Sequence, residues 1–269
     1  MPDAMKKDEF YIGYLPKAPK KIARTTLLAV VGFFILLGVT AFMIVSGQQT
    51  INNGTYEFGE LTEVEGLIYK TPHPFIKVSA GKDIEGNEVY KNILLINFGK
   101  FGASETLEKI ESKVGVLFNS VYVKLRGTLI YHNGVTLLEL TELENSYISY
   151  RPMVDRYQYS KKTTDLGQMT LSGEIVDSKC YFGSMKPGEG KPHRSCAALC
   201  ISGGIPPVYV VQNENKEADY YLMVGANGQK INQELLPYVA ENVTLKGRVE
   251  QSDEWKILYV NPDDIQRSE

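Results

Sequence analysis

The chain has 269 residues, of which 43% are apolar and 23% are charged, and its formal net charge is −3. This is the balance of a globular protein, and the small net charge argues against nucleic acid or an anionic surface as the partner. Frequent Val and Thr, together with 17 Tyr, favour β-structure. After an N-terminal anchor, about 220 residues remain, enough for one large or two small domains.

An uncharged segment near the N-terminus predicts a transmembrane helix. Residues 25–46 read TTLLAVVGFFILLGVTAFMIVS, and these 22 residues, at about 1.5 Å each in a helix, cross a hydrocarbon layer about 30 Å thick. A cleaved signal peptide is the alternative. It is disfavoured because the apolar run is longer than the apolar region of a signal peptide, and no A-x-A-like cleavage site follows.

Basic residues predict the orientation of this helix. Six lysines and arginines precede it, whereas the first basic residue after it is Lys70. The positive-inside rule therefore places residues 1–24 in the cytoplasm, as a short tail, and everything after the helix outside. We expect a single-pass protein of the cytoplasmic (inner) membrane whose C-terminal domains are extracytoplasmic or periplasmic.

Two weakly similar halves follow the helix. The first opens with LTEVEGLIY around Gly66 and closes with VYVKLRGTLIY around Gly127, and the second opens with MTLSGEIVD around Gly173 and closes with VTLKGRVEQ around Gly247. A glycine inside an alternating strand marks a bulge or a tight bend, as barrel corners need. A mainly β fold of two small OB-like Greek-key β-barrels is predicted, with β-sandwiches as the alternative.

The domain boundaries follow from this pattern. Residues 47–150 are expected to form the first barrel, residues 151–165 a polar linker, and residues 166–269 the second barrel. Asn133-Gly134 predicts a tight hairpin turn. In chain order, we expect strands at 61–69, 75–78, 92–98, 121–131, 135–140, 169–177, 207–211, 220–224, 243–251 and 256–260, and helices at 103–113 and 232–240.

The residues that carry chemistry gather in one glycine-rich loop of the second half. The paired glycines are 61 residues apart in the first half and 74 apart in the second, and the surplus follows Asp177. A short helix at 196–202, capped by Ser195 and ended by Gly203, would place two of the cysteines on one face. The loop holds all three cysteines of the chain, one histidine and one methionine: Cys180, Cys196, Cys200, His193 and Met185.

Three interpretations of this cluster are open. In the first, Cys180 forms a disulfide with Cys196 or Cys200, which an oxidising compartment favours. In the second, Cys180, His193, Cys196 and Cys200 bind zinc or copper, with Met185 as a further soft ligand. In the third, a cysteine of lowered pKa at the helix N-terminus does redox or nucleophilic work. The odd number of cysteines argues against a purely structural role.

The second half also resembles a group of small secreted bacterial OB-like domains of uncharacterised function. The resemblance spans residues 167–265 and lies in a D-x-K-C … H-x-x-C-x-x-x-C pattern, followed by a glycine and an apolar strand. It implies an OB-like barrel but no activity. This chain differs by its membrane anchor and its preceding barrel. The matching residues are Asp177, Lys179, Cys180, His193, Cys196, Cys200 and Gly203.

The sequence holds no nucleotide-binding or hydrolase motif and no defensible pair of general acid and base. We therefore expect a non-enzymatic accessory subunit or interaction module of a membrane or periplasmic complex, with a structural or metal-binding Cys/His site. The alternative is a redox or copper-handling protein. Its partners would be the membrane and other membrane or periplasmic proteins.

Two further residues are expected to have structural roles only. His73, between two prolines, is expected in a surface loop, and Trp255 is expected to pack in the protein core.

Overall fold

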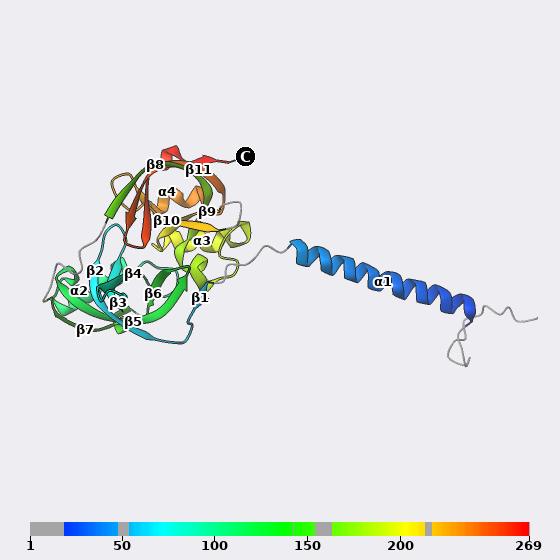
Figure 1. The fold of residues 1–269 in the computed structure, drawn as a ribbon, viewed down its shortest axis with the longest axis horizontal. Helices are drawn as coiled ribbons and strands as arrows, with labels where there is room; N and C mark the ends of the chain where they lie inside the picture. Colours follow the sequence, from blue (N-terminus) through cyan, green and yellow to red (C-terminus); the bar gives the residue numbers. More distant parts are fainter. Residues whose placement is uncertain (1–18, 48–53, 142, 154–162, 213–216, 269) are drawn as a thin grey trace, which may run out of the picture. The chain divides into compact units, whose positions relative to one another are not determined.

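The structure is a computed structural model that describes residues 19–47, 54–141, 143–153, 163–212 and 217–268 (Figure 1). It divides into two units, Met1–Thr50 and Ile51–Glu269. In the first unit, helix α1 (Lys20–Gly47) contains a 27-residue span, Lys20–Ser46, that is long and apolar enough to cross a membrane. At about 1.5 Å per residue this span is about 40 Å long. The predicted tail lies mostly outside the described residues.

The first sheet of the second unit closes into a five-stranded barrel. Around the barrel the order is β5-β2-β3-β4-β6, and β6 pairs with β5 again. Only the β4–β6 pair is parallel, and α2 lies between β4 and β5 in the chain. This is the Greek-key OB arrangement that was predicted. The elements are β1 (Thr55–Tyr56), β2 (Thr62–Tyr69), β3 (Phe75–Lys82), β4 (Glu88–Ile96), α2 (Ser104–Val114), η2 (Phe118–Ser120), β5 (Val121–His132), β6 (Val135–Leu140), η3 (Leu143–Ser146) and β7 (Tyr147–Pro152).

The second sheet repeats the same plan. Its order around the barrel is β8-β9-β10-β12-β11, β11 pairs with β8, and again only the third and fifth strands, β10 and β12, pair in parallel. The second OB-like barrel is therefore also confirmed. Its elements are β8 (Thr163–Asp177), η5 (Cys180–Ser184), η6 (Lys191–His193), α3 (Arg194–Ser202), β9 (Pro207–Gln212), β10 (Ala218–Gly225), α4 (Asn232–Leu235), η7 (Leu236–Tyr238), β11 (Asn242–Ser252), β12 (Trp255–Val260), η8 (Pro262–Asp264) and β13 (Gln266–Arg267).

Glycine allows the first strand of each barrel to lie close to its neighbour. A Cβ atom on Gly66 would stand 2.1 Å from the carbonyl oxygen of Lys77, and one on Gly173 would stand 2.1 Å from that of Val210. Real Cβ atoms do not approach a carbonyl oxygen so closely, so no other residue fits without moving the second strand. The glycines that revealed the repeat in the sequence occupy equivalent places in the two barrels.

The helix predicted at 232–240 is shorter than expected. Helix α4 ends at Leu235, and the chain continues as the single turn η7. Pro237 lies in that turn. Proline has no backbone N–H to donate, and its ring clashes with the preceding turn of an α-helix, so it stops the regular hydrogen-bond pattern. The predicted hairpin turn is present, with positive φ at both Asn133 (44°) and Gly134 (84°).

The two barrels pack against each other, contrary to the picture of two domains on a linker. Residues of both barrels share one apolar core, for example Ile130 and Leu137 of the first with Val208 and Leu222 of the second. The ends of the predicted linker belong to strands, since β7 runs to Pro152 and β8 starts at Thr163. Residues 154–162 lie outside the described residues. Thus 51–269 is one compact unit that contains two barrels.

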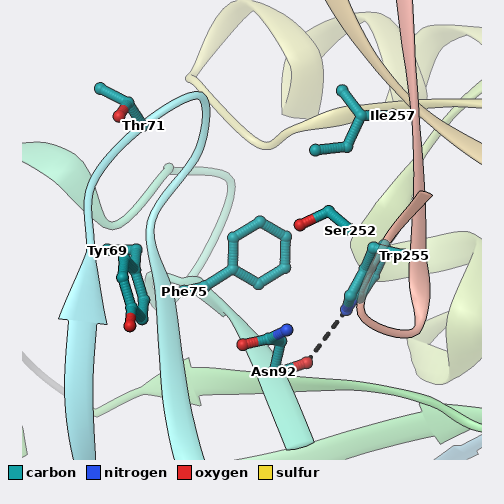
Figure 2. A pocket seen from close by; sticks show the side chains of 7 residues that line it. All are labelled: Tyr69, Thr71, Phe75, Asn92, Ser252, Trp255 and Ile257. Carbon is teal, nitrogen blue, oxygen red and sulfur yellow. Dashed lines mark hydrogen bonds between the residues drawn. The ribbon is translucent and has the colours of Figure 1, made fainter. Parts of the chain in front are cut away.

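Aromatic packing forms part of the seam between the barrels. The rings of Phe75 and Trp255 are 5.4 Å apart in an edge-to-face arrangement, and the indole N–H of Trp255 donates a 3.0 Å hydrogen bond to the carbonyl oxygen of Asn92 (Figure 2). The cavity left beside them is about 10 Å³, close to the space that one water molecule needs. The packing role expected for Trp255 is confirmed, and its partners come from the other barrel.

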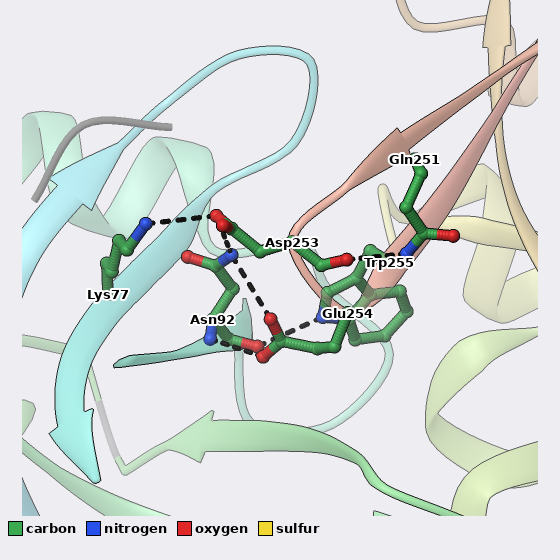
Figure 3. A network of polar contacts seen from close by, with 6 residues as sticks. All are labelled: Lys77, Asn92, Gln251, Asp253, Glu254 and Trp255. Atoms are coloured by element: carbon green, nitrogen blue, oxygen red, sulfur yellow. Dashed lines mark hydrogen bonds and ion pairs between the residues drawn. The ribbon is translucent and has the colours of Figure 1, made fainter. Parts of the chain in front are cut away.

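Charged groups also form contacts between the two barrels beside this aromatic packing. Asp253, in the turn between β11 and β12, contacts the ammonium of Lys77 at 3.0 Å and the side-chain amide of Asn92 at 2.7 Å (Figure 3). Glu254 also accepts hydrogen bonds from Asn92, and burial raises the pKa of Glu254. The Lys77 side chain is only 3% exposed, so this ion pair is shielded from solvent.

The expectation that His73 lies on the surface was wrong. His73 is 1% exposed, because the second barrel covers the loop between β2 and β3, and its Nε2 lies 3.2 Å from the carbonyl oxygen of Met223. Burial lowers the pKa of His73 to about 4. The two flanking prolines correctly indicate a loop, but nothing in their vicinity indicates that another barrel packs on it.

Candidate metal centre

The cysteine loop connects the first two strands of the second barrel, β8 and β9, and α3 lies between the two barrels (Figure 1). Helix α3 starts at Arg194, two residues before the predicted helix, and Gly203 follows its last residue as expected. The predicted cap was wrong: Ser195 lies inside the helix, and His193 occupies the N-cap position, from which its side chain does not cap the backbone of the first turn. Cys196 is thus the third residue of α3.

Glycines allow the backbone of this loop to pass close to neighbouring backbone. A Cβ atom on Gly188 would stand 2.6 Å from the carbonyl oxygen of Cys180, and one on Gly183 would stand 2.7 Å from that of Thr55 in β1. A Cβ on Gly203 would stand 1.9 Å from the carbonyl oxygen of Lys100. The loop is glycine-rich because the backbone passes close to itself and to the first barrel.

The three cysteines converge, as predicted. Their Sγ atoms all lie within 4.8 Å of one another, and the three residues could hold a metal ion. Cys180 and Cys200 are buried, whereas Cys196 is partly exposed. All three are free thiols, so the alternative disulfide of Cys180 with Cys196 or Cys200 is not supported. The cysteines belong to the core shared by the barrels, which holds their positions by packing rather than by a covalent bridge.

The imidazole of His193 lies in a second set of groups that could hold a metal ion, with Asp177 and Cys180. Its Nε2 is 2.9 Å from Oδ2 of Asp177, and its Nδ1 is 3.1 Å from Sδ of Met185. The four predicted ligands therefore do not form one set. They form two sets that share Cys180, because His193 is turned toward the carboxylate of Asp177, the last residue of strand β8.

Asp177 organises both sets from a fully buried position. One carboxylate oxygen, Oδ1, accepts a 2.8 Å hydrogen bond from the backbone N–H of Cys180, while Oδ2 faces His193. A metal-binding histidine usually gives its other ring N–H to a carboxylate, which fixes the tautomer and the ring orientation. Asp177 is in the D-x-K-C pattern, but its spacing alone did not indicate a role beside His193.

Two lysines near the cysteine loop make contacts that were not predicted: Lys100 was not singled out in the sequence, and Lys179 was named only as part of the D-x-K-C pattern. The ammonium of Lys100, in the loop between β4 and α2, is 3.1 Å from Sγ of Cys196. Lys179 donates a 2.7 Å hydrogen bond to the carbonyl oxygen of Gly99 and pairs with the buried Glu139, which also accepts from Tyr56. Lys100 and Glu139 come from the first barrel, so no local pattern could have connected them to the loop.

The electrostatic surroundings of the two sets differ. The pKa of Cys180 is raised, first because the thiol shares a hydrogen bond with Cys200 and second because burial disfavours its thiolate. For His193, burial acts to lower the pKa, but the carboxylate of Asp177 and the neighbouring Cys180 raise it overall to about 9. The hydrogen bond with Cys196 raises the pKa of Lys100. The protonated forms of His193 and Lys100 are thus both stabilised, His193 by the carboxylate of Asp177 and Lys100 by the sulfur of Cys196.

Comparisons with known proteins do not identify this chain. No protein-family model matches it, and no curated protein matches it. One solved structure that resembles it is a deletion mutant of the single-stranded DNA binding protein from Thermus aquaticus, at 12% identity over 81% of this chain and 92% of that one, with a TM-score of 0.21. So low a score carries no argument about function, and the resemblance to small secreted bacterial domains stays a prediction.

Proposed function

We propose that this chain is a membrane-anchored accessory protein that binds a thiophilic metal ion in its extracytoplasmic domain. The observation that supports this most directly is the convergence of three free thiols within 4.8 Å of one another. A metal–sulfur bond of about 2.3 Å places thiolates about 3.8–4.0 Å apart in tetrahedral or trigonal geometry, so thiols no more than 4.8 Å apart can hold one ion with at most a small shift.

Anchorage at the inner membrane is part of the same proposal. Helix α1 supplies the candidate span, and the lysines and arginines before it support a cytoplasmic N-terminus. A reporter enzyme that is active only outside the cytoplasm, fused after Glu269, should be active. The same reporter fused before Met1 should be inactive, and the reverse result would contradict the orientation. Recovery of a chain that has lost α1 would instead indicate a signal sequence.

Zinc and copper are the two metals to distinguish. Three thiolates and an imidazole suit Zn²⁺, whereas thiolates with a thioether suit Cu(I). A metal-handling role is supported by the partial exposure of Cys196, because a purely structural metal is usually enclosed by its ligands. The accessory role is proposed from the sequence, which holds no nucleotide-binding or hydrolase motif.

The proposal is tested by elemental analysis of the full chain, purified anaerobically in detergent and titrated separately with Zn²⁺ and with Cu(I). One equivalent of one metal should bind tightly, and Cys180→Ser, Cys196→Ser and Cys200→Ser should each weaken binding. Met169→Leu, in strand β8 and outside both sets of candidate ligands, is a control that should leave binding unchanged. If neither metal binds, and the thiols instead become oxidised in pairs during turnover with a disulfide substrate, the redox alternative is correct.

A further inference from the structure

We propose that the centre contains a second, inner position for Cu(I), formed by Cys180, His193 and Met185, beside the outer position formed by the three cysteines. This inference rests on the proposed metal binding and deepens it, because it names the ion and divides the site. Cys180 belongs to both positions, since its Sγ lies within 4.8 Å of the sulfur atoms of Cys196 and Cys200 and, separately, of a ring nitrogen of His193 and a carboxylate oxygen of Asp177. Met185 joins the inner position through its contact with the same imidazole ring.

The contact between His193 and Met185 has the geometry of a pair of metal ligands. Nδ1 and Sδ are 3.1 Å apart. An ion about 2.0 Å from a nitrogen and about 2.3 Å from a sulfur, with a ligand angle between a right angle and the tetrahedral value, separates those two atoms by about 3.0–3.5 Å. The observed separation lies within this interval, so an ion could be held by both atoms with little movement of either side chain.

Asp177 prepares His193 for this role without serving as a ligand itself. Both oxygens of its carboxylate are occupied: Oδ1 accepts from the backbone N–H of Cys180 at 2.8 Å, and Oδ2 is 2.9 Å from Nε2 of His193. With Nε2 held by this carboxylate, Nδ1 faces Met185, and it can bind an ion once its own proton is displaced. The carboxylate also places one negative charge close to a bound cation, in a setting that is fully buried.

The ligand types of the inner position favour Cu(I) over zinc. A thiolate, a thioether and an imidazole are soft or borderline ligands, and thioether sulfur binds Cu(I) but is seldom used by Zn²⁺. Met185 stands out because its side chain is 43% exposed although its sulfur contacts the buried His193. The inner position can therefore be reached from solvent through Met185, and the outer one through the partly exposed Cys196.

A shared thiolate allows an ion to pass between the two positions without leaving the protein. The ion keeps its bond to Cys180, loses its bonds to Cys196 and Cys200, and gains bonds to His193 and Met185. Copper remains Cu(I) throughout, so no electrons are exchanged. One released thiolate takes up the proton that His193 loses from Nδ1 as it binds the ion, and the other takes up a proton from solvent. The site can then accept an ion from one donor and release it at a second sulfur.

The test uses the full chain in detergent, loaded anaerobically with Cu(I) supplied as its acetonitrile complex. The variant Cys196→Ser/Cys200→Ser removes the outer position and should still bind one Cu(I), with nitrogen and sulfur neighbours in X-ray absorption. Adding Met185→Leu to this variant should lower its affinity for Cu(I) at least tenfold, and adding Met169→Leu should not. Circular dichroism and thermal unfolding show whether each variant is folded.

The outcomes separate this inference from the proposed function. If the wild-type chain binds Cu(I) and the folded double variant does not, a single position exists and the inference is wrong, while metal binding stands. If the wild-type chain binds no Cu(I), the proposed copper site fails as well. Should the double variant not fold, Cys200→Ser alone asks the same question: a nitrogen neighbour of copper that disappears in Cys200→Ser/His193→Gln supports the inner position, and its absence contradicts it.

Discussion

Oδ2 of Asp177 lies 2.9 Å from Nε2 of His193, and the two side chains are 0% and 1% exposed. A buried carboxylate beside a buried imidazole holds Nε2 and fixes the orientation of the ring, so that Nδ1 faces Met185. This pair connects the end of a barrel strand to the cysteine loop, and most of the testable consequences of the structure depend on it.

Replacing this carboxylate should weaken metal binding without abolishing it. Asp177→Asn keeps an oxygen for the backbone N–H of Cys180 but loses the negative charge that orients His193. Loss of such an orienting partner typically reduces metal affinity by about 10- to 100-fold. Competition titration against a coloured chelator measures the change. Asp264→Asn, on the exposed turn η8, is the matched control and should have no effect. Equal affinities for Asp177→Asn and the wild type would show that His193 is not a ligand.

The stability of the metal-free chain should fall at alkaline pH because of His193. Its pKa in the folded state is about 9, above the value near 6.5 of an unfolded chain. Its protonated form therefore stabilises the fold fully below about pH 6.5, and this contribution is lost as the pH rises toward 9. Urea unfolding at a series of pH values should show the decline in the wild type and a flatter profile in His193→Gln. Identical profiles would contradict the assignment.

His73 should produce the opposite dependence at acidic pH. Its pKa is lowered to about 4 by burial, so the unfolded chain takes up a proton below about pH 6.5 while the folded chain does not. Stability is then lost as the pH falls from about 6.5 to 4, by about 3 kcal/mol in total. In His73→Gln this part of the loss should be absent, although the variant itself is less stable at neutral pH. A proton NMR titration of His73 with a midpoint near 6.5 would overturn the prediction.

The seam between the barrels should make them unfold together. Trp255 is the only tryptophan in the chain, and it packs on Phe75 and hydrogen-bonds to Asn92 of the other barrel. Its fluorescence and the far-UV circular dichroism should therefore report one coincident transition. Trp255→Ala should lower the free energy of unfolding by about 3–5 kcal/mol. Two separated transitions in the wild type would show that the barrels are independent domains.

Much of the fold could be predicted because each barrel is encoded locally. The alternating strands, the Asn133-Gly134 turn and the strand glycines such as Gly66 and Gly173 act within a few residues or between adjacent strands. The seam could not be predicted in the same way, because His73 and Trp255 acquire their partners about 150 residues away or more. Residues 51–269 therefore looked like two domains on a linker, although they form one unit.

The candidate site was also predictable in part: its residues could be named from the sequence, but their contacts could not. Its thiols and His193 could be named from the sequence, because all the cysteines lie in one loop that the first barrel lacks. Their grouping could not, since it depends on the direction in which the His193 ring turns. Lys100 was also out of reach, because its contact with Cys196 exists only when the first barrel packs against α3.

The central claim, that Cys180, Cys196 and Cys200 act as one metal-binding set, is tested most directly by counting reactive thiols. The full chain is alkylated anaerobically with and without one equivalent of Cu(I) or Zn²⁺, then analysed by mass spectrometry. One equivalent of the bound metal should slow the alkylation of all three cysteines well below the rates in the metal-free chain, and a strong chelator should restore those rates. Protection of none of them, or a metal-free chain that is 2 Da lighter because two thiols are already joined, would contradict the account.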